Sequence, residues 1–419
     1  MRIKTNLPKA IVYKEAGAGG AAPGVSFRPT ALASSDDFIK VIYEGGYFVA
    51  IGANGSIACS KEGQTWTSRK LGEYAFCDID YINGAYVIVG SVGSKGLILS
   101  SVDLSSWRTE AETDLGGAKD SYGHAYSLLF RGIWNNGRDY IVMAVAYTSN
   151  YSIQYAYTGG SVRGLKQVLI EDKLERYPAG GYASASQILK GNSRIGIVRQ
   201  MTNRGKIWYT SDGSDFESVE LPSGSTMPGG GTAMFFYEGY FQQGIVYRKA
   251  ATGGNYATYA HVYRSINLKQ WEAVGPGLLH STEGELPSFK CALRMGDYSL
   301  YIGEHAGLLV GDGEDIVGKA PEERFPISPS VTVNSAARSG SRIVCVGDGG
   351  VVFWANVDGD DKNMEIAPST VDQEVYIRKS DNVRMLRVKA VTGGIDPNIR
   401  PENIKKGVTV LGVAGTYGG

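Results

Sequence analysis

Short apolar segments recur along the chain, each starting just after a glycine or a polar turn, and most of them run into another glycine. Their length and flanking turns are typical of buried strands. The first and last anchors, Tyr47 and Ile343, lie 296 residues apart, which gives about 49 residues for each of the six intervals. The seven segments are GGYFVAIG (45–52), NGAYVIVG (83–90), GRDYIVMAVA (137–146), NSRIGIV (192–198), EGYFQQGIV (238–246), GDYSLYIG (296–303) and GSRIVCVG (340–347).

A second repeated motif follows several of these segments. Its hydroxyl and short acidic or amide side chain can hydrogen-bond nearby backbone N–H groups, so each copy predicts a hairpin turn closed by an aromatic ring. The motif resembles the Asp-box of sialidase-like β-propellers, although Leu104 and Leu268 replace its glycine. A weaker fifth copy at 310–316 keeps Asp312 and Gly313. The four clear copies are SKEGQTW (60–66), SVDLSSW (101–107), TSDGSDF (210–216) and SINLKQW (265–271).

The two motifs together predict an all-β protein. Alternating strands such as SIACS and GKIWYTS lie between the glycine-bounded segment and the turn, and helical periodicity is missing from 38–367. Seven such units can bury each other's faces, so we predict that 38–367 forms a seven-bladed β-propeller. Residues 1–37 are expected to close the ring with a strand from LPKAIVYKEAG or SFRPTALASS, because closure leaves no open sheet edge.

The character of the chain changes near Pro368. Beyond it, EVYIRKSD and NVRMLRVKAV alternate like exposed strands, so 368–419 is predicted to be a small β-rich module with few apolar residues to bury. The run PENIKKGVTVLGVAGTY (401–417) resembles a short module at or near the ends of bacteriophage tail-fibre and baseplate proteins. This resemblance implies a virion protein, made in the host cytoplasm, that assembles with other tail proteins and serves host adsorption. Whether the chain forms a homo-oligomer is left open.

Composition and charge argue against several other classes. The 42 Lys and Arg residues balance 42 Asp and Glu residues, so the chain lacks the basic footprint of a nucleic-acid-binding protein. No apolar core of a signal peptide and no apolar run of about 18 to 20 residues occurs, so we expect neither a cleaved signal nor membrane insertion. No metal, disulfide framework or cofactor is expected, because no C-x-x-C spacing occurs among Cys59, Cys77, Cys291 and Cys345.

The sialidase-like resemblance leaves a glycosidase as an alternative. It implies an arginine triad, a Tyr/Glu nucleophile pair and an acidic residue in the central basin. The spacing of the candidate arginines does not show that three of them converge, and Arg28-Pro29 is a poor counterpart of the family's early arginine motif. No nucleophile or metal motif is found either, so we predict a protein that is not an enzyme. The candidate arginines are Arg131, Arg199, Arg248 and Arg294.

Aromatic residues on loops are the candidate ligand contacts, because flat rings can cover the C–H faces of sugars. By contrast, Tyr151, Tyr155 and Tyr157 recur at period two and predict the apolar face of a strand. We therefore expect loops on one propeller face to bind a host cell-surface polysaccharide, with a virion decoration protein without ligand as a third reading. The loop candidates are Tyr122, His124 and Tyr126 after a Gly-Gly turn, Tyr177 and Tyr182 around Pro178, and Tyr256 and Tyr259 in a glycine-rich insertion.

Overall fold

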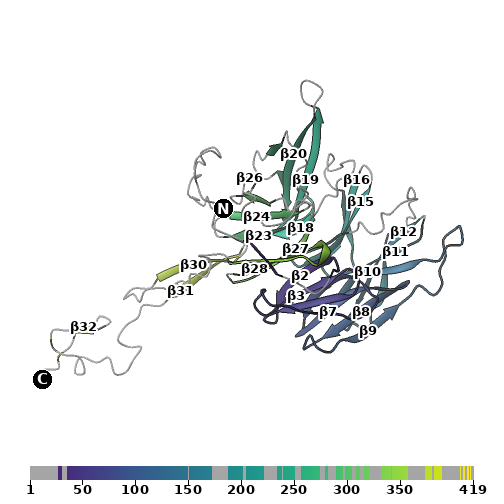
Figure 1. Ribbon diagram of the computed structural model, residues 1–419, viewed down its shortest axis with the longest axis horizontal. Coiled ribbons are helices and arrows are strands. Elements are labelled where there is room, and N and C mark those ends of the chain that lie inside the picture. Colours follow the sequence, from purple (N-terminus) through teal and green to yellow (C-terminus); the bar gives the residue numbers. More distant parts are fainter. Residues whose placement is uncertain are drawn as a thin grey trace. The chain divides into compact units, whose positions relative to one another are not determined.

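The computed structural model is an all-β, seven-bladed β-propeller followed by a small β-rich unit, as the sequence predicts (Figure 1). Seven antiparallel sheets follow one another along the chain, and each has four strands in its main ladder. The structure describes residues 27–30, 35–149, 151–171, 187–201, 204–220, 234–237, 239–250, 256–273, 279–281, 289–295, 298–303, 308–311, 316–319, 332–340, 342–356, 373–379, 382–388, 406, 409–410, 413–414 and 416.

The blades are numbered in chain order, and their strands run from the innermost outward. Blade 1 consists of β2 (Phe38–Glu44), β3 (Tyr47–Gly52), β4 (Ser56–Ser60) and β5 (Thr67–Lys70); blade 2 of β6 (Ala75–Ile82), β7 (Ala85–Val92), β8 (Lys95–Ser101) and β9 (Arg108–Thr113). Blade 3 consists of β10 (Ser127–Asn135), β11 (Tyr140–Tyr147), β12 (Ser152–Gly159) and β13 (Lys166–Glu171); blade 4 of β14 (Gln187–Gly191), β15 (Arg194–Met201), β16 (Arg204–Thr210) and β17 (Glu217–Glu220).

Blades 5 to 7 complete the propeller. Blade 5 consists of β18 (Met234–Tyr237), β19 (Tyr240–Ala250), β20 (Tyr256–Ser265) and β21 (Glu272–Ala273), with β22 (Leu279–Ser281) also paired to β20. Blade 6 consists of β23 (Phe289–Met295), β24 (Tyr298–Gly303), β25 (Leu308–Gly311) and β26 (Ile316–Lys319). Blade 7 consists of β27 (Val333–Ser339), β28 (Arg342–Gly347), β29 (Val352–Asn356) and β1 (Arg28–Thr30), with the 3-10 turn η4 (Asp348–Gly350) before β29.

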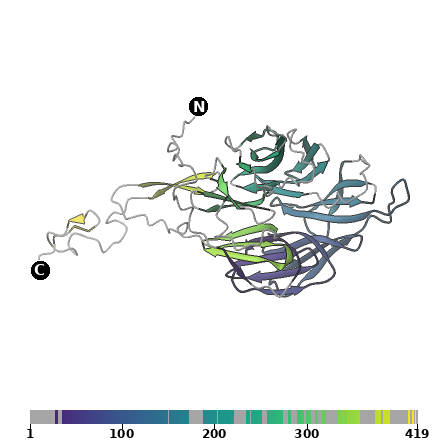
Figure 2. The ribbon, with the colours of Figure 1, turned by 45° about the horizontal axis from the view of Figure 1, so that its top comes forward.

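The N-terminal segment closes the ring. β1 lies within the SFRPTALASS stretch and pairs with β29 as the outermost strand of blade 7, with Arg28 opposite Trp354. The innermost strands of consecutive blades contact one another all the way round, and β27 meets β2. Figures 1 and 2 accordingly show the yellow-green strands of blade 7 beside the purple strands of blade 1. The Arg28 guanidinium lies 5.2 Å from the centroid of the Trp354 ring, so a cation–π contact also holds β1, and Arg342 of β28 lies 4.5 Å from the same ring.

A β-bulge in the innermost strand explains why several apolar segments end in glycine. The pairing of the first two strands slips near its start in blades 1, 2, 6 and 7, and near its middle in blade 3. The second strand ends beside this bulge, where a Cβ on Gly90 would lie 2.1 Å from the Ala75 carbonyl oxygen and a Cβ on Gly347 would lie 2.0 Å from that of Thr332. Only glycine allows such a close approach, so the bulge leaves a periodic trace in the sequence.

The hydrophobic core lies between neighbouring blades. The second strand of each well-described blade is covered on both sides, and in β3 the side chains of Val49 and Ile51 are fully buried. These two residues pack with Ile79 and Ile88 of blade 2 in one apolar cluster. Because each sheet buries its neighbour's face in this way, the apolar alternation of a blade is satisfied only within the ring.

The four repeated turns share one geometry, which we call the box turn. In the copy at 101–107, the Ser101 hydroxyl accepts the Leu104 N–H at 2.9 Å, and the Trp107 indole N–H donates to the Leu104 carbonyl at 3.3 Å. The fourth residue has a left-handed backbone in every copy, even where it is leucine. The φ angles are +75° at Gly63, +60° at Leu104, +81° at Gly213 and +67° at Leu268.

Burial offsets the strain of a left-handed leucine. Leu268 is fully buried and packs with Leu189 and Tyr209 of blade 4, so the box turn of blade 5 anchors itself in the preceding blade. Each box turn also accepts a hydrogen bond from a side chain of the preceding blade. These donors and acceptors are Arg342 to the Glu62 carbonyl, Arg69 to the Leu104 carbonyl, Asn136 to the Ser211 carbonyl and Arg194 to the Asn267 carbonyl.

A buried carboxylate joins four blades at the inner strands. Asp78 of β6 is only 3 % exposed and accepts hydrogen bonds from the ammonium groups of Lys40 in blade 1 and Lys190 in blade 4. It also accepts the Ile133 backbone N–H of blade 3 at 3.0 Å. Burial alone would raise the pKa of Asp78, but the Lys190 and Lys40 charges outweigh it and hold that pKa below its ordinary value. The ion pairs therefore tie together blades that are distant in sequence. We call this the central tie.

Residues 361–419 form a second compact unit, which begins seven residues before the expected boundary at 368. It contains two small antiparallel sheets, β30 (Gln373–Lys379) with β31 (Asn382–Val388) and β32 (Thr409–Val410) with β33 (Val413–Ala414). Strands β30 and β31 fall on the two segments for which alternation predicts strands. In the part of the chain that the structure describes, no helix has the length and apolar character needed to span a bilayer.

Candidate functional site

The two ends of the propeller carry different turns. Because the strands of a blade are antiparallel and sequential, the turns after its first and third strands lie at one end. The turns after its second strand lie at the other end, together with the connections between blades. We call the first end the box face, because it carries the four box turns, and the other the connecting face. Among the connections that are described throughout, the longest is 114–126, between β9 and β10 on the connecting face.

The loop 114–126 is organised around Asp120. The Asp120 carboxylate accepts the backbone N–H groups of Tyr122 and His124, each at 2.9 Å, and the Thr148 hydroxyl from the next blade at 2.9 Å. Burial alone would raise the pKa of Asp120, but these hydrogen bonds outweigh it and lower the pKa to about 2. The carboxylate is therefore ionised at neutral pH and fixes the loop to the β11–β12 turn.

The loop presents aromatic rings to solvent. Tyr122 is 55 % exposed, and its ring stacks on that of Tyr151 with the centroids 6.0 Å apart and the planes 20° from parallel. The His124 ring lies 6.4 Å from the Tyr122 ring, and the Ser121 hydroxyl lies 3.4 Å from the Tyr151 hydroxyl. We call Tyr122, His124 and Tyr151 the tyrosine platform. It offers flat apolar surface edged by hydroxyl and imidazole groups.

The structure brings only some of the predicted residues to this platform. Tyr122 and His124 belong to it, whereas Tyr126 is partly buried and packs on the core cluster between blades 2 and 3. The assignment of Tyr151 to the apolar face of a strand is wrong, because the Thr148 hydroxyl accepts its N–H in the turn before β12. The regular period-two spacing concealed this turn. Tyr157 is 4 % exposed and does belong to the core, as that spacing predicts.

Two other predicted candidates lie in a strand rather than in a loop. Tyr256 pairs with Ala250 and Tyr259 pairs with Tyr247 in the long β19–β20 hairpin. The expectation that the glycine-rich insertion carries both tyrosines is therefore wrong, because the strand pairing continues to Tyr256 and takes up part of the insertion. Tyr177 and Tyr182 lie outside the described residues.

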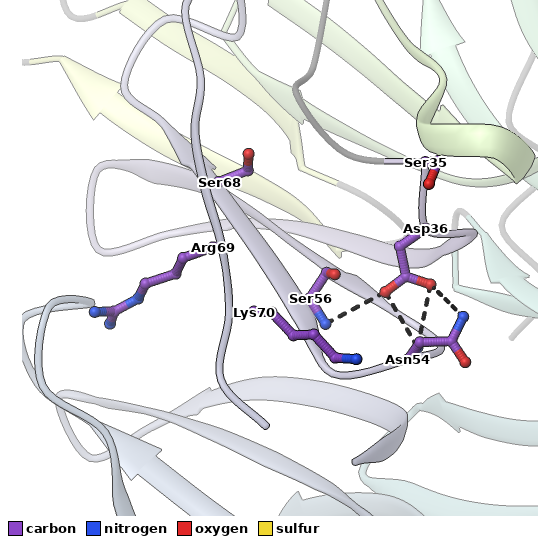
Figure 3. A pocket seen from close by; sticks show the side chains of 7 residues that line it. All are labelled: Ser35, Asp36, Asn54, Ser56, Ser68, Arg69 and Lys70. Carbon is purple, nitrogen blue, oxygen red and sulfur yellow. Dashed lines mark hydrogen bonds between the residues drawn. The ribbon is translucent and has the colours of Figure 1, made fainter. Parts of the chain in front are cut away.

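A polar cavity opens on the same face in blade 1 (Figure 3). Its volume is about 400 Å³. Asp36 accepts the backbone N–H and the side-chain amide of Asn54 and the backbone N–H of Ser56, over 2.8 to 3.3 Å. Hydroxyl, amide and charged groups thus line the cavity around a fixed turn. We call it the blade-1 cavity, and its lining residues are Ser35, Asp36, Asn54, Ser56, Ser68, Arg69 and Lys70.

The arginines considered for an enzyme lie on strands of two kinds. Arg131 and Arg294 belong to the innermost strands β10 and β23, whereas Arg199 and Arg248 belong to the second strands β15 and β19. The Arg131 guanidinium donates to the Cys77 sulfur at 3.8 Å. Within the described residues, no group of three His, Cys, Asp or Glu side chains is placed to hold a metal ion.

Several solved structures are similar to the chain at low sequence identity. No family model and no curated protein sequence matches the chain. The WD40 β-propeller domain of Doa1 is similar at 10% identity over 80% of this chain and 97% of its own, with a TM-score of 0.45. BamB from Moraxella catarrhalis is similar at 11% identity over 78% and 100%, with a TM-score of 0.43. An α-L-arabinanase from Penicillium chrysogenum, complexed with arabinobiose, is similar at 13% identity over 67% and 92%, with a TM-score of 0.40.

Proposed function

We propose that this propeller is an adsorption protein of a bacteriophage tail or baseplate and that its connecting face binds a host cell-surface polysaccharide. The exposed stack of Tyr122 on Tyr151 is the observation that carries the binding part of the proposal. The resemblance of residues 401–417 to a module of phage tail proteins supports the virion part.

The platform is suited to a sugar ring. A pyranose has apolar C–H faces and a hydroxyl edge, so it can stack on the Tyr122 ring and exchange hydrogen bonds with the Tyr151 hydroxyl and the His124 imidazole. The backbone of Tyr122 is fixed by the hydrogen bond that its N–H donates to Asp120, and its ring stacks on Tyr151, which reduces the entropy lost on binding. A few stacked rings and hydrogen bonds give weak binding at one site. Many copies on one particle would raise the effective affinity by about 10² to 10⁴ where the geometry allows.

The test is adsorption of the purified chain to bacterial cells with and without defined surface polysaccharides. We expect binding to one polysaccharide type and its loss in the double variant Tyr122→Ala/Tyr151→Ala, with little change in melting temperature. Ile266→Ala is a matched control, because Ile266 is 59 % exposed on the box face, and it should adsorb like the wild type.

Four results would contradict the proposal. Unchanged adsorption of the tyrosine variant would mean that the binding site lies elsewhere. A large loss of stability in that variant would mean that the two rings belong to the hydrophobic core. No binding to any cell or polysaccharide would favour a decoration protein without ligand. Release of reducing ends from the polysaccharide by the purified chain would favour the glycosidase.

A further inference from the structure

The connecting face carries a second hollow besides the tyrosine platform, the blade-1 cavity. We infer that this cavity binds another sugar residue of the same polymer, so that one propeller holds an extended, uncharged polysaccharide at two subsites. The inference rests on the proposed function, because it takes the ligand of the tyrosine platform to be a glycan.

The groups that line the cavity can form the hydrogen bonds that a sugar needs. The hydroxyls of Ser35, Ser56 and Ser68 can each donate and accept, and the Asn54 side chain offers an amide. Figure 3 shows Lys70 extending toward the side of the cavity that holds Ser56 and Asn54. Sugar hydroxyls also donate and accept at the same atom, so they can satisfy such a surface. A volume of about 400 Å³ lies in the range of small-molecule sites.

The charges around the cavity favour an uncharged ligand. Arg69 and Lys70 are matched by Asp36 in the lining and by Glu73, whose carboxylate lies 2.7 Å from the Lys70 ammonium. Two positive and two negative groups leave no net charge. The Arg69 guanidinium donates to the Leu104 carbonyl at 2.7 Å and is thus engaged with blade 2. A carboxylate or phosphate would have to compete for cations that already have partners.

The wall of the cavity is held in place before a ligand arrives. Asp36 fixes the turn between β3 and β4 through Asn54 and Ser56. Gly55 in this turn has a φ of +84°, and a Cβ there would lie 2.2 Å from the Gly72 carbonyl oxygen. Glycine therefore allows the turn to pack closely against the connection to blade 2. Because a preformed site loses little conformational entropy when a ligand binds, its contacts contribute more fully to the affinity.

The two subsites belong to equivalent parts of two blades. Asn54 lies in the turn after the second strand of blade 1, and Tyr151 lies in the turn after the second strand of blade 3. Both turns lie on the connecting face. A polymer that engages one subsite therefore presents further sugar residues to the other at high effective concentration, which a single repeat unit cannot do.

The experiment compares two ligands and three proteins. The ligands are the surface polysaccharide that binds the wild-type chain, taken intact and hydrolysed to single repeat units, both expressed per repeat unit. The proteins are wild type, the cavity variant Ser68→Ala/Lys70→Ala and the box-face control Ser105→Ala/Lys269→Ala. The control removes one hydroxyl and breaks an exposed Lys–Glu pair, as the cavity variant does.

We expect wild type and control to bind the intact polymer at least about tenfold more tightly than the repeat unit. The cavity variant should lose most of this gain but keep the affinity for the repeat unit. If it retains the gain, or if wild type shows none, the second subsite is overturned while the tyrosine platform stands. Salt-sensitive binding of an acidic polymer through Lys70 would overturn the uncharged ligand. Absence of binding to either ligand would instead contradict the proposed function.

Discussion

The box face of this propeller carries turns of one repeated geometry, whereas the connecting face carries loops of different lengths. On the box face, four turns repeat one backbone geometry. Their side chains bond to their own backbone, and their backbone carbonyls accept hydrogen bonds from side chains of the preceding blade. On the connecting face, the loop 114–126 has no counterpart of equal length among the described connections, and it exposes Tyr122. The turns that repeat therefore make the contacts that stabilise the ring, whereas the long loop that does not repeat carries the exposed aromatic surface.

The largest loss of stability is expected at the central tie of the innermost strands. Asp78→Ala would leave the Lys40 and Lys190 ammonium groups without their common carboxylate, and such a loss typically costs about 3 to 5 kcal/mol. Chemical denaturation should show this decrease in the free energy of unfolding. Glu73→Ala, which breaks an exposed pair with Lys70, is the control and should cost at most about 1 kcal/mol. A similar small effect at Asp78 would mean that the central tie does not hold the blades.

The next largest effect is expected on the box face. Leu268→Ala would remove a fully buried side chain from the box turn of blade 5, at a cost of about 2 to 5 kcal/mol. In the box turn of blade 4, adding a side chain should also lower the stability of the protein. A Cβ on Gly213 would lie 2.8 Å from the Thr158 hydroxyl and 2.9 Å from an Ile141 side-chain carbon. Gly213→Ala should therefore cost about 1 to 3 kcal/mol. If both variants unfold like the wild type, the box turns do not anchor neighbouring blades.

A pH-dependent effect is expected on the connecting face. Because hydrogen bonds lower the pKa of Asp120 to about 2, its contribution to stability is fully present above the unfolded value of about 3.9. It is lost as the pH falls from there toward about 2. The difference in unfolding free energy between wild type and Asp120→Asn should be constant above about pH 4 and shrink below it. A difference that grows on acidification would contradict the assigned ionised carboxylate.

The smallest effect on the propeller is expected from removing the second unit. Residues 361–419 form a compact unit of their own, so a chain of residues 1–360 should unfold as cooperatively as the propeller of the full chain, at nearly the same temperature. Calorimetry of both chains measures this. A broad or strongly lowered transition in the shortened chain would show that the two units share one core.

Local features of the propeller were predictable from the sequence, and distant contacts were not. The glycine-bounded segments are visible because each bulge excludes a Cβ at positions such as Gly90 and Gly347. The central tie leaves no such trace, because Lys40, Asp78 and Lys190 meet only when four blades have assembled. Short-range patterns therefore specify the blades, while the charges at their centre depend on the closed ring.

The candidate site was predictable only where a loop is marked by glycine. The turn at Gly116 and Gly117 correctly places Tyr122 outside the strands. Tyr151 keeps the spacing of the strand that follows it, so its turn has no signature in the pattern. The prediction for Tyr256 is wrong for the opposite reason. The glycine-rich stretch beside it suggests a loop, although the strand pairing of the hairpin reaches Tyr256.

The most direct test of the account is hydrogen exchange of the full chain with and without the surface polysaccharide that it binds. Binding at the connecting face predicts slower exchange in 114–126 and around Thr148 and Tyr151, with no change in the box turns at 101–107 and 265–271. Protection confined to the box turns, or spread equally over both faces, would contradict a polysaccharide site on the tyrosine platform.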